Sequence, residues 1–479
     1  MNIAKAILLA VHPEYQKRKD DWDFFLQSYE GGSNYFTKEN IFTHGRENAS
    51  DYEWRLKRAT YQNCCEGIIG IYTGHLFKKP IIRNPEGDEE FEIFFNDVDR
   101  RGHSINDFFK NIADLMQILG HVYILVDQPR TNGEIKTAAD RQANGVTPYY
   151  SVIYPQNCVN WELDADGNFE WVRLMEVLDV QPSPFEKRET QIRYRTFSKE
   201  AWWLHDGDGQ MIDAGVHELG EVPLIPVWNG QLKRYPLFGW SAIEDIAFIN
   251  RKLANLSSLL DEFMYRQCFS ILIWPDTGAT DDETSEGEIN LSTQNMVLLP
   301  DDVGFTPQFI EPSTAPAEFL MNYMNELRSA IYQLARLEAP DMRPEVASGT
   351  SKRWGFHETN QSLADKADNL EEAEINCHRL RALWMDKEWK GVVDYPEEFD
   401  IRAVNQELED ALRVKMYGFP PTFNNEYAKQ LWRKLLPKVG KDIAVKIDED
   451  IEKGVASMNN VTEAEEETVR RITQRLQEV

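Results

Sequence analysis

Apolar residues in the middle of the chain recur at steps of three and four, which is the spacing of one face of an α-helix. The first such segment carries Ile246, Ile249, Leu253, Leu256, Leu260 and Phe263. The second carries Leu320, Met324, Leu327, Ile331 and Leu334. Ser241 and Glu244 have capping-box spacing at the start of the first segment, and Pro316 suits the first turn of the second. The pattern predicts two amphipathic helices, roughly 40 and 30 Å long at about 1.5 Å per residue.

Between these helices the pattern changes to short β-type runs. Ile271–Pro275 and Met296–Leu299 form two such runs, and an acidic stretch over 281–288 separates them. Because short returns make neighbouring helices antiparallel, the two helices are expected to lie side by side and to carry a small β-rich insertion.

A short segment rich in Pro, Gly and Ser follows the second helix, over 339–355, and is predicted to be a loop. It carries three cations and an aromatic residue in an acidic chain: Arg343, Lys352, Arg353 and Trp354. The cations either neutralise nearby acids or contact a polyanion. Residues 356–389 then repeat the helical spacing and predict one helix about 50 Å long, more than a small domain covers alone. Its apolar stripe consists of Leu363, Ala367, Leu370, Ala373, Cys377, Leu380 and Trp384.

The N-terminal half alternates between helical and strand patterns. The stretch from Asp51 to Leu76 is predicted to be one long helix. Ile105–Leu119 predicts another helix, ended by Gly120 and followed by the buried strand His121–Asp127 in an α/β step. Strand patterns separated by turn residues then predict an antiparallel meander. The predicted fold class is α+β, with a charged helical region from residue 396 onward.

Charge and composition limit the classes of function. The 479 residues include 80 acidic and 52 basic side chains, a net charge of −28 that opposes tight binding of a polyanion. No apolar run approaches the roughly 20 residues of a membrane span, and the N-terminus has no signal-peptide pattern. We therefore expect a soluble protein that is intracellular or assembled inside a cell, without a membrane partner. The five cysteines form no CxxC pair and are expected to be reduced.

No catalytic motif is complete. Gly440 and Lys441 are followed by Asp442 rather than Ser or Thr, so there is no phosphate-binding loop. Gly239 and Ser241 form half of a nucleophile elbow, but Ile243 stands where the second glycine is required. We predict no enzyme, no catalytic residues, no metal site and no cofactor. A metal-dependent hydrolase, such as a nuclease, stays open as an alternative, because chance pairs are expected among 80 acids.

The order of these parts resembles the portal, or head-to-tail connector, proteins of tailed bacteriophages. Short strings add to the resemblance: Tyr52-x-x-Arg55-x-x-Arg58-Ala59, Gly74-x-Leu76-Phe77-Lys78-Lys79-Pro80, Leu119-Gly120-x-x-Tyr123-Ile124-Leu125-Val126-Asp127 and Ser348-Gly349. The resemblance implies a portal-like fold with an α/β wing over 1–236, a first stem helix over 237–270, a small β-rich clip over 271–312 and a second stem helix over 313–338. A tunnel loop over 339–355, a long helix of the wing over 356–395 and a helical crown over 396–479 complete the plan.

The resemblance also implies a function. Portal subunits form a homo-oligomeric ring, usually a dodecamer, at one capsid vertex of the virion, and they assemble in the host cytoplasm. Double-stranded genome DNA passes through the ring during packaging and ejection. The tunnel-loop residues Arg343, Lys352, Arg353 and Trp354 would contact this DNA without reading its sequence.

By the same resemblance, the clip would dock the terminase motor and the tail adaptor. Its docking residues would be Trp274, Asp281, Asp282, Glu283 and Glu286. Major capsid and scaffolding proteins would be further partners. The other alternative is a different virion structural or adaptor protein, which would lack the paired stem helices and the long helix.

Overall fold

The computed structural model divides the chain into two compact units, Met1–Glu397 and Glu398–Val479. It describes residues 4–45, 47–86, 90–129, 146–230, 237–267, 271–276, 296–300, 308–310, 313–337, 349–396, 399, 423, 425–429, 432 and 446–451. Only the backbone is described at 266–267, in the strands between 271 and 310, and at 349–358. In the second unit the described residues from 423 onward are helical, and the Trp432 indole donates a hydrogen bond to Asp448, 2.9 Å away.

The N-terminal part of the first unit is helical. Its helices are α1 (Lys5–Leu8), α2 (Pro13–Glu30), α3 (Ala49–Arg58), α4 (Cys64–Leu76), α5 (Phe91–Asn96) and α6 (Ile105–Leu119). The single helix predicted from Asp51 to Leu76 is wrong. Ala59 leaves the helical conformation, and Asn48 and Asn63 each cap a separate helix by accepting a hydrogen bond from the backbone of its first turn.

Two antiparallel sheets form the β part of this body. The three-stranded sheet has the order β3-β2-β9, with β2 (His121–Asp127) buried along its length between β3 (Tyr149–Ile153) and β9 (Leu224–Trp228). The five-stranded meander runs in chain order through β4 (Cys158–Leu163), β5 (Phe169–Val180), β6 (Glu189–Ser198), β7 (Ala201–Asp206) and β8 (Met211–Val216). The predicted mixture of helix and antiparallel sheet is confirmed. A parallel α/β arrangement of the wing is not found among its described strands.

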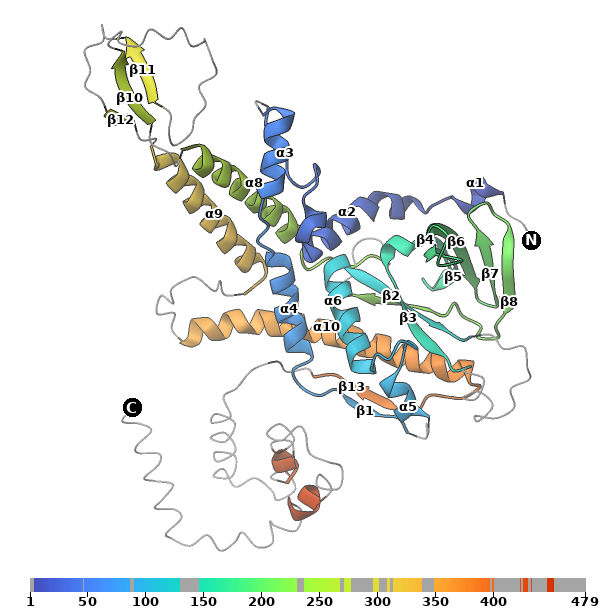
Figure 1. Cartoon of the computed structure of the whole chain (residues 1–479). Helices are drawn as coiled ribbons and strands as arrows, with labels where there is room; N and C mark the ends of the chain where they lie inside the picture. Colours follow the sequence, from blue (N-terminus) through green and yellow to red (C-terminus); the bar gives the residue numbers. More distant parts are fainter. Residues whose placement is uncertain are drawn as a thin grey trace, which may run out of the picture. The chain divides into compact units, whose positions relative to one another are not determined.

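The middle of the chain forms two helices, and the segment that connects them in sequence forms a small sheet (Figure 1). Helix α8 (Glu244–Gln267) and helix α9 (Ala315–Leu334) lie side by side. Between them come β10 (Ile271–Asp276), β11 (Met296–Pro300) and β12 (Gln308–Ile310), in the order β11-β10-β12. Strands β10 and β11 are parallel, whereas β10 and β12 are antiparallel.

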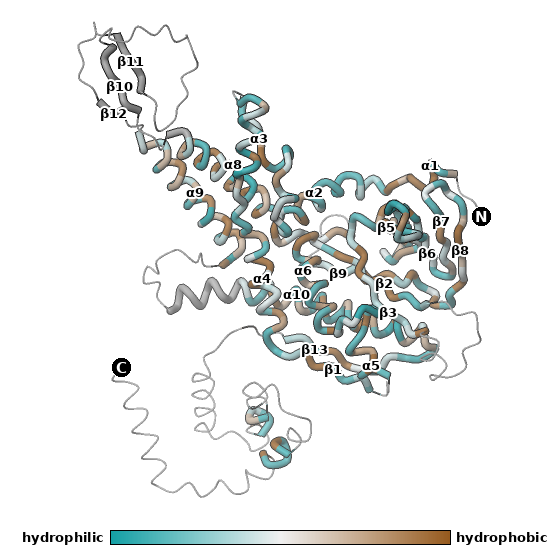
Figure 2. Tube along the Cα trace, viewed as in Figure 1, coloured by the Kyte–Doolittle hydropathy of each residue, from teal (hydrophilic) through white to brown (hydrophobic). Residues whose placement is uncertain are grey.

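Helix α10 (Gly349–Trp384) follows and runs through the body. Its predicted apolar stripe is confirmed as buried except at its end: Leu363, Ala367, Leu370, Ala373, Cys377 and Leu380 are each at most 2% exposed, and Trp384 is half-buried. The expectation that one chain could not cover this stripe is wrong. Strands β2 and β9, helix α4 and strand β13 (Val392–Asp394), which pairs with β1 (Ile82–Asn84), pack against α10 in the same chain. Figure 2 shows apolar segments gathered where these elements meet.

Candidate functional site

The start of α8 is fixed to the body by a close approach of two glycine backbones. Gly120 ends α6 in a left-handed conformation, φ 83°, and a Cβ atom on Gly239 would overlap the Gly120 carbonyl oxygen. The Asn229 backbone N–H donates to the Gly120 carbonyl at 3.0 Å, and its side-chain amide donates to the Trp240 carbonyl at 2.8 Å. The segment that enters α8 is therefore held against the end of α6 on both sides.

Ser241 takes part in the same junction, but not as the predicted capping box. Its hydroxyl donates to the Ile118 carbonyl at 2.6 Å and accepts from the Ile243 N–H at 3.2 Å. The Ala242 N–H also donates to the Gln117 carbonyl at 2.8 Å. The hydroxyl thus satisfies a carbonyl at the C-terminus of α6, which is left without an intrahelical partner.

Polar side chains bind the first half of α8 to the segments around it. The Asn255 amide oxygen accepts from the Phe42 N–H at 2.8 Å, and its amide nitrogen donates to the Asn40 carbonyl at 2.7 Å. Asn250, fully buried, donates to the Tyr61 hydroxyl. Each bond joins residues about two hundred positions apart in sequence, so this half of α8 is hydrogen-bonded to the N-terminal part of the chain.

The two helices of the pair cover each other only in part. On α9 only Ala317 and Ile331 are buried among its 20 residues, and most of the predicted stripe is half-buried. Large apolar side chains of both helices are exposed, between 44% and 72%: Phe248, Met264, Tyr265, Phe319, Met321 and Leu334. A monomer therefore leaves a substantial apolar surface on this pair uncovered.

The C-terminal end of α9 and the body of α10 are joined to each other. The Thr359 hydroxyl donates to the Arg336 carbonyl at 2.9 Å, and the Tyr72 hydroxyl of α4 donates to the Ala335 carbonyl. Arg336 and Thr359 are therefore in contact, and we call the chain between these two residues the excursion. All four predicted tunnel-loop residues belong to this excursion.

The structure differs from the predicted loop in one respect. Lys352, Arg353 and Trp354 lie in the first two turns of α10, because the helix begins at Gly349 rather than after residue 355. Gly349, Ser351 and Gly355 are weak helix formers, which is why the pattern favoured a loop. Arg343 lies outside the described residues, as do the side chains of the other three.

The predicted clip residues divide in the same way. Trp274 lies in β10, where its backbone is opposite Leu298 of β11, and its side chain is outside the description. The acidic residues lie outside the described residues altogether: Asp281, Asp282, Glu283 and Glu286.

The remaining part of α10 is locked by a buried ion pair. The Arg83 guanidinium of β1 donates to both carboxylate oxygens of Glu374, and the Tyr395 hydroxyl donates to the same carboxylate at 2.7 Å. Burial by itself would raise the pKa of Glu374, but the hydrogen bonds from Arg83 and His378 outweigh it and lower the pKa well below its usual range. His378 also contacts the Tyr150 hydroxyl at 3.0 Å. Arg83, Glu374, Tyr395, His378 and Tyr150 thus form one hydrogen-bonded network that joins α10 to β1, β3 and the segment after β13.

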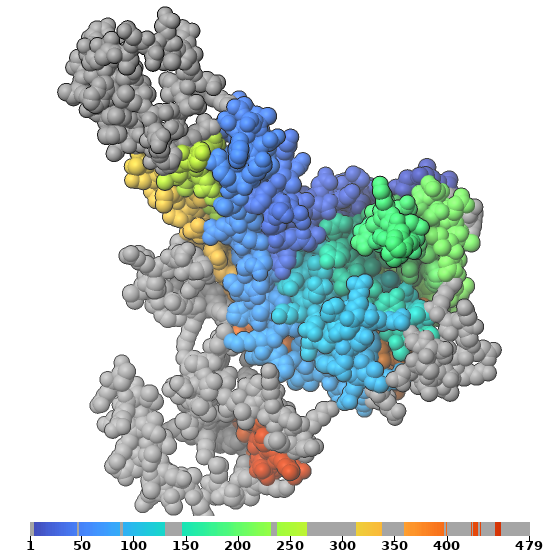
Figure 3. Space-filling view, in the orientation of Figure 1, coloured from blue at the N-terminus to red at the C-terminus, as the bar shows by residue number. Residues whose placement is uncertain are grey.

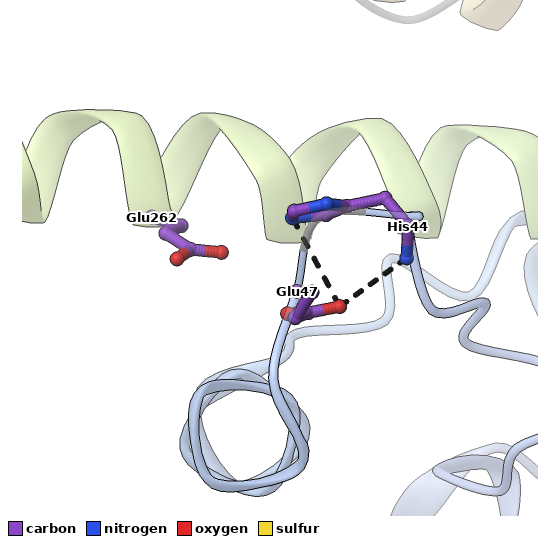
Figure 4. Close-up of side chains that lie close together, drawn as sticks. All are labelled: His44, Glu47 and Glu262. Atoms are coloured by element: carbon purple, nitrogen blue, oxygen red, sulfur yellow. Dashed lines mark hydrogen bonds and ion pairs between the residues drawn. The ribbon is translucent and has the colours of Figure 1, made fainter.

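Among the described residues, one cluster has the composition of a metal site: His44, Glu47 and Glu262 (Figure 4). However, the guanidinium of Arg55, only 2% exposed, binds Glu47 in two places, at 2.7 and 2.8 Å, and lies 3.8 Å from Glu262. The hydrogen bond from Arg55 lowers the pKa of Glu47. The carboxylates of Glu47 and Glu262 thus lie around the Arg55 guanidinium, and the cluster connects α3 to α8.

The junction at Gly239 and Asn229 was not predicted from the sequence. Gly120 follows one predicted helix and Gly239 precedes another, so each residue marks the end of an element in the sequence. Nothing in the sequence shows that the two residues are in contact. None of the helices that the structure describes is both long and apolar enough to cross a membrane.

No protein-family model matches the chain, and no curated protein matches it. Solved structures of gene transfer agent (GTA) particles are similar in part. One, from the virion of a native GTA particle, has 9% identity and a TM-score of 0.43 over 84% of this chain and 90% of the other. A second, from the neck of an empty particle computed with C6 symmetry, has 11% identity and a TM-score of 0.40, over 79% and 90%. A third, from the neck of a native particle computed with C12 symmetry, has 9% identity and a TM-score of 0.38. The match covers 77% of this chain and 89% of the other. Values this low do not establish a shared fold or function.

Proposed function

We propose that this chain is the subunit of a portal ring at one vertex of a phage-like capsid, through which double-stranded DNA is packaged and ejected. One observation carries the proposal: the order helix, small sheet, helix, short excursion and long helix over 244–384. This order matches the stem, clip, tunnel loop and wing helix that the sequence resemblance implies. A different virion structural or adaptor protein would lack both the helix pair and the long helix.

The half-covered helix pair supports the ring. Apolar side chains such as Phe319 and Met321, exposed by 72% and 54%, lie on α9 next to an α8 that is firmly attached to the body. In a ring, the neighbouring subunits would bury this surface, as in obligate assemblies. Twelve subunits is the number that the resemblance implies.

The attachment of α8 supports a mechanical role. Contacts with Gly120, Ser241 and Asn229 join the helix to the end of α6, and Thr359 joins α9 to α10. A force applied to the sheet between α8 and α9 would therefore reach the body through these hydrogen bonds. The terminase motor and the tail adaptor would dock on this sheet, through Trp274 and the acids Asp281, Asp282, Glu283 and Glu286.

The DNA contact is assigned to the excursion between Arg336 and Thr359. Arg343, Lys352 and Arg353 would bind phosphates weakly and without sequence preference, and Trp354 would pack beside them. The net charge of −28 suits a channel that confines DNA without holding it tightly. The role is architectural and not catalytic, and it places the protein in the virion after assembly in the host cytoplasm. Major capsid and scaffolding proteins would surround it.

Two measurements test the proposal. Native mass spectrometry of the purified chain, with class averages of the same sample, is expected to give a closed ring of about a dozen copies with a central hole. A monomer with metal-dependent nuclease activity would instead support the hydrolase alternative.

The second measurement is the DNA content of particles assembled with Arg343, Lys352 and Arg353 all replaced by alanine. We expect intact rings and reduced packaged DNA. Replacing Lys19, Lys38 and Lys110, exposed cations of the body, is the matched control and should leave DNA content unchanged. Normal DNA content in the first variant would reject the assigned contact.

A further inference from the structure

The β5–β6 hairpin extends beyond the meander as a two-stranded ribbon. Strand β4 pairs with β5 only as far as Leu174, and β7 pairs with β6 only from Arg193 onward. The pairs from Val177↔Ile192 to Val180↔Glu189 therefore have no third strand among the described strands. In Figure 3 the ribbon is the green lobe that stands out from the body. A two-stranded ribbon is marginal in water by itself, so its outer part gains from a partner.

The ribbon exposes apolar side chains where a solvated hairpin would carry polar ones. Phe185 at the tip is 97% exposed, the highest value of any large apolar residue among those described. Val177 and Ile192, 51% and 43% exposed, face each other across the two strands. The pair Val177 and Ile192 and the tip residue Phe185 are thus separate exposed apolar groups on the ribbon, with the hydrogen-bonded pair Asp179 and Thr190 between them.

Hydrogen bonds and prolines restrict the backbone of the tip. The Glu186 N–H donates to the Ser183 carbonyl at 3.1 Å, and the Gln181 side chain donates to the Glu186 carbonyl at 2.9 Å. Pro182 and Pro184 restrict the backbone of the same turn. A tip fixed in this way loses little conformational entropy when it binds.

A cleft of about 550 Å3 lies at the opposite end of the same strands. The β4–β5 turn, β9 and α10 form its walls, and its apolar floor includes Val222, Leu224 and Trp228. Its volume is that of a site for a small ligand or a few side chains. Because β5 has 12 residues at about 3.3 Å each, roughly 40 Å separate the cleft from the ribbon tip of the same chain.

Two exposed cations of the ribbon tip are opposite in sign to two exposed acids of the cleft. Lys187 and Arg188 at the ribbon tip are exposed and form no ion pair with a described residue. Asp166 and Glu372, which line the cleft, are likewise exposed and without an ion-pair partner in the described part of the chain. Glu186 and Glu189 flank the two cations, so residues 186–189 carry no net charge. In the cleft, Lys199 pairs with Asp164 and Arg379 pairs with Glu221, which leaves Asp166 and Glu372 as acids without a cation among the described residues.

We propose that the β5–β6 ribbon of one copy inserts into the α10–β9 cleft of the next copy. Phe185 fills the apolar floor, while Lys187 and Arg188 meet Asp166 and Glu372 at its rim. Since ribbon and cleft lie at opposite ends of one strand, the contact is head-to-tail and repeats from copy to copy, which closes into a ring or continues as an open chain. The choice of a second copy as the partner rests on the proposed ring.

The experiment measures self-association of the full chain by mass photometry over a range of concentrations. Burying one phenylalanine in an interface corresponds to about 10- to 100-fold in the dissociation constant, so Phe185→Ser should weaken association by that factor. The side chain is 97% exposed, so the substitution should leave folding intact. Val216→Ser, at a residue 78% exposed on the edge strand β8, is the matched control and should change nothing.

Charge exchange tests the pairing itself. Reversing Lys187 and Arg188 to Glu, or Asp166 and Glu372 to Lys, should each weaken association, and all four changes in one chain should restore it. Rings that neither Phe185→Ser nor the reversals affect would reject the ribbon contact and leave the ring standing.

Other outcomes separate the two proposals. Open chains that depend on Phe185, with no closed ring, would support the contact and reject the ring. A wild-type protein that stays monomeric at every concentration would reject both. Loss of association without restoration in the fourfold variant would show that the ribbon binds something other than this cleft.

Discussion

Replacing Lys366 by methionine is expected to stabilise the protein. Lys366 lies on α10, 6% exposed, with its ammonium group 3.2 Å from the Ser362 hydroxyl and 5.4 Å from the centre of the Tyr72 ring. No carboxylate among the described residues forms an ion pair with it. Burial lowers the pKa of Lys366 to about 8, from the ordinary lysine value of 10.5.

The sign and size of the effect follow from this shift. A cation whose pKa is lower in the folded state costs stability wherever both states are protonated. The cost is about 3 kcal/mol at pH 7 and falls to about 1 kcal/mol at pH 9.5, because the native state has then released the proton while the unfolded state keeps it. Methionine has a similar shape and no charge, so Lys366→Met should gain most of this energy.

Urea unfolding of both proteins at pH 7 and pH 9.5 measures the effect. The stability difference between variant and wild type should shrink by about 2 kcal/mol between the two pH values, whatever the packing of methionine contributes. Lys19→Met, at an exposed position on α2, is the control and should stay within about 0.5 kcal/mol of wild type at both. An equal difference at pH 7 and pH 9.5 would refute the claim that burial penalises the charge of Lys366.

Two further predictions concern the attachment of α8. Gly239→Ala places a methyl group against the Gly120 carbonyl and should destabilise the protein by about 1–3 kcal/mol in thermal unfolding. The control Gly74→Ala, in open space on α4, should stabilise the protein by about 0.5–1 kcal/mol. Equal effects of the two substitutions would argue against the close approach of Gly239 to Gly120. Arg55→Met should lower the free energy of unfolding in urea by about 3–5 kcal/mol, because it leaves the carboxylate of Glu47 buried without its cation. Adding Glu47→Gln to the same chain should recover part of this loss. No recovery would mean that Arg55 stabilises the protein by packing alone.

The helices with a clear stripe were predictable because burial on one face imposes a local period. The stripe of α10, for example Leu363 and Leu370, is buried as the spacing predicted. The end of α6 at Gly120 followed by β2 is also a local signal, since a left-handed residue ends a helix. The break between α3 and α4 was visible only in hindsight, because Asn63 as a cap is one polar residue within a helix-like run.

What covers each stripe was decided by the tertiary structure. The sequence by itself determined the order of helix, small sheet, helix and long helix over 244–384 and the apolar faces of α8, α9 and α10, but not the break between α3 and α4 or the strands β1 and β13. It did not determine that α10 is covered within the chain while α8 and α9 remain half-covered, nor that Gly239 meets Gly120 or that Arg55 reaches Ser258. Periodicity records that a face is buried but not against what, and contacts between residues over one hundred positions apart exist only once the whole chain has folded.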